Sequence, residues 1–335
     1  MLPDLKANKY LLVCLYFTIL IFALYFFEVF LVFNRDSYFS DSENYYLASS
    51  VFPPNNYDSF VYVYLLSFFR SVLSYKLTLI LFISIYLSLT LFWFRSLKLK
   101  NINLLFLFHP FIIFIFARGL KEIAIIIFFL VFFRFYNHNK VFSILNFSLV
   151  ICFSLLLDGL KPLGAILVPI SLLLTYFLSN FLKTRSLLYY GGLLLLIAPL
   201  LRNTLIDLIP TIKNHVNVLW NSGYAVEYTR NFVKPILAFV FGPGPFKSFQ
   251  SFFYPVYEFG TIMTSLTLLV GSIISIILVI KLISKINSIQ NCKWNNFIII
   301  FTIIHVISYI LIQDGSVDTR QRGLMFFYLG LIRWK

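Results

Sequence analysis

Residues 104–133 read LLFLFHPFIIFIFARGLKEIAIIIFFLVFF, and this stretch decides the fold class. Two apolar runs, 104–116 and 123–133, flank one polar break, Arg118-Gly119-Leu120-Lys121-Glu122. At a rise of 1.5 Å per residue, each run forms a helix only about 15–20 Å long. A spanning helix needs about 20 apolar residues, so we expect the polar ends of these helices below the membrane surface, inside protein or a wet cavity.

The rest of the chain has the same apolar character. Hydrophobic residues make up 60% of it and charged residues 12%, and the mean hydropathy is +0.88. A soluble domain carries about 25% charged residues, so the composition excludes a water-soluble protein. No Gly/Ser/Pro linker separates two halves, and residues 1–335 are therefore predicted to form a single integral-membrane domain of the all-α class.

The apolar segments predict a polytopic helical bundle of about ten transmembrane helices. Besides the two short runs, the expected helices cover residues 10–33, 77–94, 141–157, 162–182, 187–201, 260–280, 296–312 and 323–332. The apolar segment 59–69 is followed closely by Arg70 and Lys76, so we predict an interfacial or re-entrant helix there, within a first outer loop at residues 34–76. A second, long outer loop with short helices is predicted at residues 202–258.

The distribution of charge predicts the orientation of this bundle. With both termini in the cytoplasm, 14 of the 27 basic residues fall on the inner side together with one acidic residue, Asp4. The outer side receives the other 13 basic residues and 11 of the 13 acidic ones. This asymmetry follows the positive-inside rule, so the net charge of +14 indicates membrane orientation rather than binding of nucleic acid.

Neither a metal site nor a cofactor is predicted. The cysteines Cys14, Cys152 and Cys292 are scattered, and the four histidines form no cluster with metal-ligand spacing. Chemistry is instead expected from charged residues at the outer ends of helices.

Several basic residues are predicted to face a shared interior cavity, because a charge at the centre of a helix in lipid costs about 2.5–3.5 kcal/mol. The set contains Arg118, Lys121, Lys161, Arg320 and Arg322, together with the carboxylate of Glu122. Arg118 and Lys121 are expected on one helical face at spacing three, and two arginines one residue apart can bind phosphates through their forked donors. Snorkelling arginines, or ion pairs that only stabilise the bundle, are the alternatives.

The first outer loop is a candidate sugar site. Asp36, Asp41 and Glu43 lie close in sequence to Tyr45, and carboxylates beside aromatic rings bind sugar hydroxyls and ring faces. The spacing Asp41-Ser42-Glu43 can also hold one divalent metal, and a solvated acidic loop is the simpler alternative.

The chain resembles the bacterial Wzy-type O-antigen and capsular polysaccharide polymerases, and more loosely the EpsG-like and GT-C-related membrane glycosyltransferases. The resemblance covers the topology of the whole chain and a few short motifs. These are His109-Pro110 with the break at 118–122, Lys161-Pro162, the Gly/Pro run at 242–245, and Thr319-Arg320-Gln321-Arg322. His109 stands where asparagine is more familiar, and Lys161 where arginine is.

The resemblance implies a multi-pass enzyme of the bacterial inner membrane. It would polymerise undecaprenyl-diphosphate-linked oligosaccharide repeat units at the periplasmic face, without metal and alongside a chain-length regulator. Arg118, Arg320 and Arg322 would then bind diphosphate, Lys121 and Lys161 would add charge, and Arg230 would reach the substrate from the long loop. Glu122 or Asp41 would activate the acceptor hydroxyl.

Two other functions stay open at this point. A GT-C glycosyltransferase using a polyprenyl-phosphate sugar donor would depend on Asp41 and Glu43. A flippase or transporter of lipid-linked glycan would carry out no bond chemistry, although its usual paired repeats are not visible in this sequence.

Overall fold

The computed structural model describes residues 5–28, 41–53, 60–96, 100–136, 143–158, 164–194, 197, 262–312 and 319–335. Within these residues the secondary structure is helical apart from one isolated bridge between Ile289 and Trp334, which confirms the all-α class. The helices are α1 (Leu5–Phe27), α2 (Asp41–Ala48), α3 (Phe60–Arg70), α4 (Tyr75–Ser96), α5 (Asn101–Leu107), α6 (Pro110–Ala117), α7 (Glu122–Phe135), α8 (Ile144–Asp158), α9 (Gly164–Phe181), α14 (Ile262–Ser284), the 3₁₀ turn η2 (Ile286–Ser288), α15 (Lys293–Ile312) and α16 (Thr319–Leu329), and residues 184–194 are also helical.

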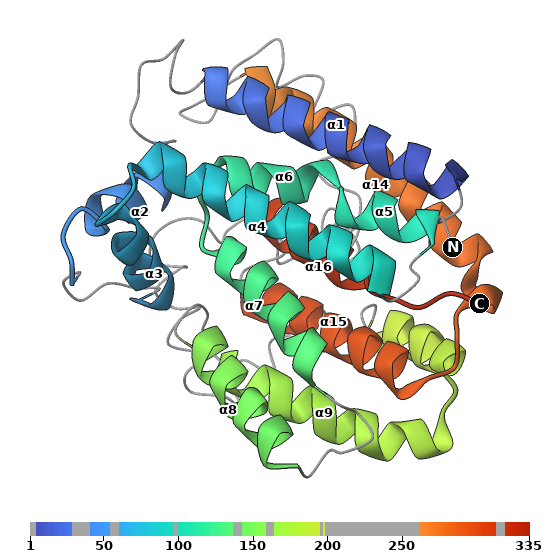
Figure 1. Cartoon of the computed structure of the whole chain (residues 1–335). Helices are drawn as coiled ribbons and strands as arrows, with labels where there is room; N and C mark the ends of the chain where they lie inside the picture. The colour runs from blue at the N-terminus through green and yellow to red at the C-terminus, as the bar shows by residue number, and fades with distance from the viewer. Residues whose placement is uncertain are drawn as a thin grey trace.

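Helix α16 forms the centre of the molecule. It packs against α5, α6, α7 and α15, and residues 321–332 are all buried. Figure 1 shows α16 between α5 and α6 on one side and α15 on the other, while α1, α4, α8 and α9 lie further out. The last helix of the chain is therefore the one most enclosed by protein, and its polar residues are held away from solvent.

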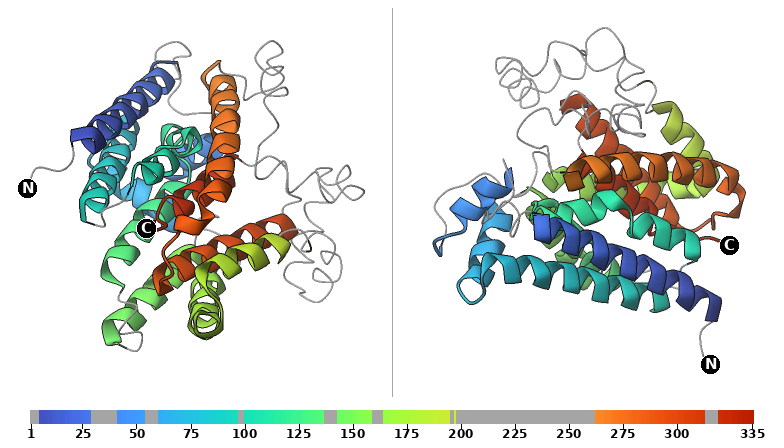
Figure 2. Two further views of the ribbon diagram at one scale, coloured as in Figure 1. Left: turned by 90° about the vertical axis from the view of Figure 1, so that its right-hand side faces the viewer. Right: turned by 90° about the horizontal axis from the view of Figure 1, so that it is seen from above.

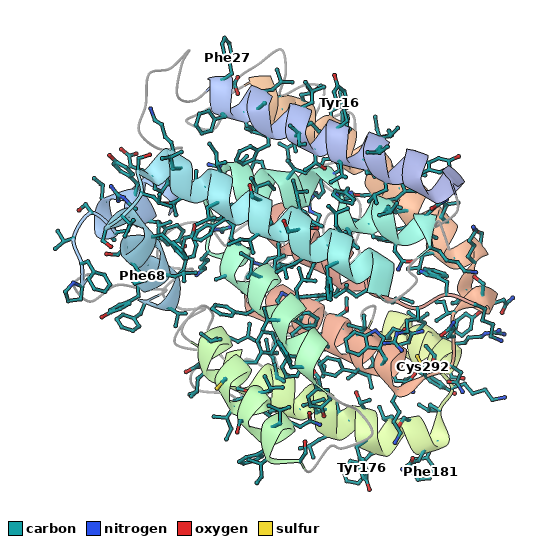
Figure 3. All side chains as sticks on the ribbon, in the orientation of Figure 1. Tyr16, Phe27, Phe68, Tyr176, Phe181 and Cys292 are labelled. Carbon is teal, nitrogen blue, oxygen red and sulfur yellow. The ribbon has the colours of Figure 1, made fainter. Side chains whose placement is uncertain are left out.

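Three described helices are long and apolar enough to cross a membrane by length and composition: Tyr10–Phe27, Tyr75–Phe92 and Ser265–Ser284. Large apolar side chains on the periphery point outward, as Figure 3 shows for Tyr16, Phe27, Tyr176 and Phe181. Exposed apolar surface on all sides is unfavourable in water and is expected where lipid is the solvent. These features support a helical membrane protein, and the count of ten spans stays a prediction.

The helix boundaries differ from the sequence prediction at two informative places. The run 104–116 is not one helix, because His109 and Pro110 divide it into α5 and α6. The last helix begins at Thr319 rather than at residue 323, so Arg320 and Arg322 belong to its first turns. The predicted interfacial segment is α3, whose 11 residues reach about 16 Å, too short to cross a bilayer.

The segments predicted to share the cytoplasmic side meet at one end of the bundle. The amide nitrogen of Asn103 donates to the carbonyls of Gly330 and Ile332, each at 2.7 Å, and Lys100 donates to the carbonyl of Lys335. Thr184 donates its backbone N–H to Asn291 at 3.0 Å. Figures 1 and 2 show both chain termini toward this end, with α2 and α3 at the opposite end.

Candidate functional site

The polar break between α6 and α7 lies at the end of the bundle that carries α2 and α3. Helix α6 ends in a Schellman turn, in which Leu120 N–H donates to the carbonyl of Ile115 and Gly119 N–H donates to that of Phe116, each at 3.2 Å. Gly119 has a φ of +61°, the left-handed conformation that this turn requires at the residue after the C-cap. The chain then reverses, and α7 begins at Glu122.

This turn corrects the expected placement of Arg118 and Lys121 on one helical face. Arg118 is the C-cap of α6, Lys121 precedes α7, and the left-handed Gly119 separates them. The two residues therefore do not belong to one helix and do not share a helical face. Arg118 is buried and Lys121 is half-buried. The break therefore places one cation inside the protein and one toward its surface.

Glu122 is linked to the first turn of α16. Gln321 donates from Nε2 to Glu122 Oε1 at 3.2 Å, and its Oε1 lies 3.0 Å from Nε2 of His305 on α15. All three side chains are buried, and Glu122 is completely so. The network joins residues from α7, α15 and α16, which supports the prediction that the break and the last helix share one interior region.

Two buried arginines lie along α6 in the same region. The guanidinium carbon of Arg322 is 5.2 Å from the ring centre of Phe111, and that of Arg118 is 5.0 Å from the ring centre of Phe114. Phe111 and Phe114 are three residues apart and share one side of α6, so that side holds both guanidinium groups. Arg322 is 0% exposed, and such a charge is retained in an apolar interior only where it is stabilised.

Gly323 brings α16 close enough for these contacts. A Cβ atom at this position would lie 3.0 Å from the carbonyl oxygen of Phe111 and 2.8 Å from the side chain of Ile115. The helices α6 and α16 therefore touch backbone to backbone, as small residues permit in membrane bundles.

Helices α2 and α3 support the break from outside. Tyr62 on α3 donates its hydroxyl to the carbonyl of Gly119 at 2.7 Å. Burial raises the pKa of Tyr62 well above its usual value, with smaller contributions from Tyr75, Tyr45 and Glu122, so the hydroxyl stays protonated and remains a donor. Arg70 in turn holds α2, donating to Ser49 Oγ at 2.7 Å and lying 4.4 Å from the ring centre of Tyr46.

The first-loop candidates are not brought into this network by the described residues. Asp41 is the first residue of α2, and Glu43 lies two residues further along the same helix. No group of three metal-ligating side chains occurs in the described part of the chain, and the alternative of a divalent metal at Asp41-Ser42-Glu43 stays a prediction. Glu43 is exposed, while Tyr45 is buried edge-on against Tyr62 and packs rather than presenting a face to solvent.

The remaining candidates lie outside the described residues. These are Asp36, Lys161, Arg230 and the long loop 202–258. Of the other predicted site residues, Arg118, Lys121 and Glu122 lie at the α6–α7 break, and Arg320 and Arg322 lie in the first turns of α16, which Gln321 joins to Glu122.

Sequence reasoning missed three polar residues of this region: Gln321, His305 and His109. His109 caps α6, its Nδ1 accepting the N–H of Phe111 at 3.2 Å, while its Nε2 lies 3.2 Å from Ser275 Oγ on α14. A histidine within an apolar run was an available signal, because such residues face the bundle interior in membrane proteins.

Comparison with known proteins adds no assignment: no family, no curated protein and no solved structure matches the chain. The function of this chain is therefore inferred from its sequence and from the geometry of the site.

Proposed function

We propose that this chain is a membrane glycosyltransferase that polymerises polyprenyl-diphosphate-linked oligosaccharides, as the Wzy-type polymerases do. The observation that carries the proposal is that buried Arg118 and Arg322 both contact α6, while Gln321 ties the buried carboxylate of Glu122 to the turn of α16 that carries Arg322. The α6–α7 break lies at the end of the apolar bundle opposite the termini. Arg320 and Lys121, both half-buried, lie in the same two segments.

Transfer of a glycan from such a carrier releases a lipid diphosphate. Negative charge develops on the leaving oxygen as the bond to the anomeric carbon breaks, and fixed cations in a low-dielectric site stabilise that charge. Arginine suits this role because its planar fork binds two phosphate oxygens and its charge persists when buried. The neighbouring carboxylate supplies a proton acceptor for the attacking hydroxyl.

Placement in the membrane suits the carrier as well as the glycan. The apolar periphery of the bundle would allow a polyprenyl chain to approach from the lipid. The polar break lies near the end that carries α2 and α3, which we expect to face water. With the positive-inside orientation, this end faces the periplasm of a bacterial inner membrane. The GT-C alternative receives less support, since no described contact joins Glu43 to the Glu122 network.

The test is complementation of a strain that lacks this gene, read on a silver-stained lipopolysaccharide gel. The wild-type chain should restore long ladders. Arg322→Ala and Arg320→Ala should leave single repeat units on the core, because removing one such donor costs about 10²- to 10³-fold in rate. Arg322→Lys should restore ladders only partly, since lysine has no fork.

Arg185→Ala is the matched control, because this arginine lies at the other end of the bundle and donates to the carbonyl of Asn287. It should give normal ladders. Membrane abundance of every variant is checked by immunoblot. Normal ladders from both Arg320→Ala and Arg322→Ala would reject the proposal, whereas a deletion strain with no units at all would indicate a flippase.

A further inference from the structure

The two carboxylate oxygens of Glu122 have different surroundings. Oε1 accepts the hydrogen bond from Gln321, whereas Oε2 is buried and has no hydrogen-bond partner among the described residues. A buried polar atom left without a partner is destabilising, and proteins usually avoid it. A buried carboxylate oxygen without a partner is suited to accept a hydrogen bond from a group that arrives with a substrate.

The orientation of the Gln321 amide follows from what its neighbours can offer. An ionised carboxylate only accepts hydrogen bonds, so the amide must present its NH₂ group to Glu122. The amide oxygen then faces His305, which must present an N–H from Nε2. His305 and Glu122 together hold the amide in this orientation, because a flip would set two acceptors against each other at Glu122 and two donors against each other at His305.

Several elements bring charged and titratable groups toward Glu122. Glu122 is the first residue of α7, where the helix dipole stabilises negative charge. The ionisable groups of the elements packed around it are Tyr62 on α3, Tyr328 on α16, His305 on α15, and the cations of the α6–α7 break and of α16. Both tyrosines interact electrostatically with the carboxylate, and the cations are Arg118, Lys121, Arg320 and Arg322.

We infer that Glu122 is the base that activates the acceptor sugar, and that Gln321 and His305 are positioning residues that hold Glu122 Oε2 toward the acceptor hydroxyl. This inference rests on the proposed function. In the reaction the hydroxyl proton passes to Oε2, and the oxygen bonds to the anomeric carbon of the donor glycan. The bond from that carbon to the diphosphate oxygen breaks, and its electron pair leaves with the lipid diphosphate.

The experiment measures the rate of polymerisation against pH. The purified full-length protein in liposomes is given lipid-linked repeat units extracted from the deletion strain, and product is resolved by length. Glu122→Gln should lose at least about 100-fold at every pH, because it removes the general base. Gln321→Leu removes a hydrogen bond to the charged carboxylate, so it should move the acidic limb of the rate profile to higher pH by about one unit. On the alkaline side, the rate of this variant should approach that of the wild type.

Variants of His305 test the orienting role separately. His305→Phe lets the Gln321 amide rotate and should shift the acidic limb in the same direction as Gln321→Leu. His305→Gln retains an N–H donor and should restore the wild-type limb. Thr302→Val is the matched control on the same helix, because Thr302 donates only within α15, to the carbonyl of Ile298 at 2.7 Å, and it should leave the profile unchanged.

The outcomes separate this inference from the proposed function. A wild-type protein that forms no polymer at any pH would overturn the proposed function. Polymerisation by the wild type, combined with a wild-type rate for Glu122→Gln, would overturn the assignment of the base alone. Equal fractional losses at every pH in Gln321→Leu and His305→Phe would show that these residues only stabilise the bundle.

Discussion

Gly119 is the residue on which the geometry of the α6–α7 break depends most directly. Its φ of +61° is unfavourable for any side chain, and a Cβ atom would lie 2.5 Å from the hydroxyl oxygen of Tyr75. Gly119→Ala should therefore lower the free energy of unfolding by about 2 kcal/mol, from left-handed strain and the forced shift of Tyr75. Thermal unfolding of the purified protein in detergent measures this loss.

Gly192→Ala is the matched control for that substitution. Gly192 lies in the helical stretch 184–194, and nothing lies within 4 Å of a Cβ atom placed there. Alanine at this position should leave the stability unchanged or raise it by up to about 1 kcal/mol, because it favours the helix. Equal melting temperatures for the wild type and Gly119→Ala would show that the turn tolerates a side chain.

Charged residues of the site could be predicted from the sequence because charge in an apolar chain is conspicuous. Arg118, Glu122 and Arg322 were identified on that ground, and the structure places all three in the buried interior. Gln321 was not identified, because an amide between two arginines has no signature until its partners on α7 and α15 are known. Long-range pairing of this kind is decided by tertiary packing, which a single sequence does not reveal.

At the scale of single elements, α6 depends on its cap. His109 accepts the N–H of Phe111 at the start of the helix, and Pro110 takes the first helical position, where no N–H is needed. His109→Ala should lower the free energy of unfolding by about 1 kcal/mol or more, because a buried N–H loses its acceptor.

The comparison variant is His109→Asn, because asparagine is a good cap and is the more familiar residue at this position in the family that the chain resembles. It should retain most of the stability that alanine loses, as measured by thermal unfolding of both variants in detergent. An equal loss in both would show that the contact of His109 with Ser275, rather than the cap, is what matters.

Helix positions were more predictable than helix ends. The long apolar runs gave α4, α8, α9, α14 and α15 near their observed bounds, since about 20 apolar residues specify a spanning helix with little ambiguity. The break at His109-Pro110 was read through because its flanks are equally apolar. Helix α16 begins four residues before the apolar run at 323–332, because a run of apolar residues does not reveal that Arg322 is buried within the helix.

At the scale of the whole molecule, the positions of lysine and arginine predict which segments lie at the same end of the bundle. Lysines and arginines divide the loops into two sets, and the structure brings the described members of the inner set together around the C-terminus. The charge pattern does not predict the central position of α16. An 11-residue helix does not look like a core element, and it becomes one only because α5, α6, α7 and α15 enclose it.

The side of the membrane on which each end lies is directly testable with two matched serines. Ser50 and Ser284 are both exposed, and each donates its hydroxyl to the carbonyl three residues earlier, but they lie at opposite ends of the bundle. Cys14, Cys152 and Cys292 are first replaced by serine, and Ser50→Cys or Ser284→Cys then gives a single thiol. We expect a membrane-impermeant maleimide, applied to cells with a permeabilised outer membrane, to label the thiol at position 50 and not that at position 284.

Both thiols should react once the inner membrane is disrupted, which shows that each is accessible in the folded protein. The expected pattern follows from the positive-inside rule, because the end near Ser284 carries Lys281 and Lys285 while that near Ser50 carries the acidic helix α2. The reverse pattern would place the arginines and Glu122 toward the cytosol. A lipid carrier whose diphosphate lies on the periplasmic side could then not reach these residues, and the proposed polymerisation would have no site.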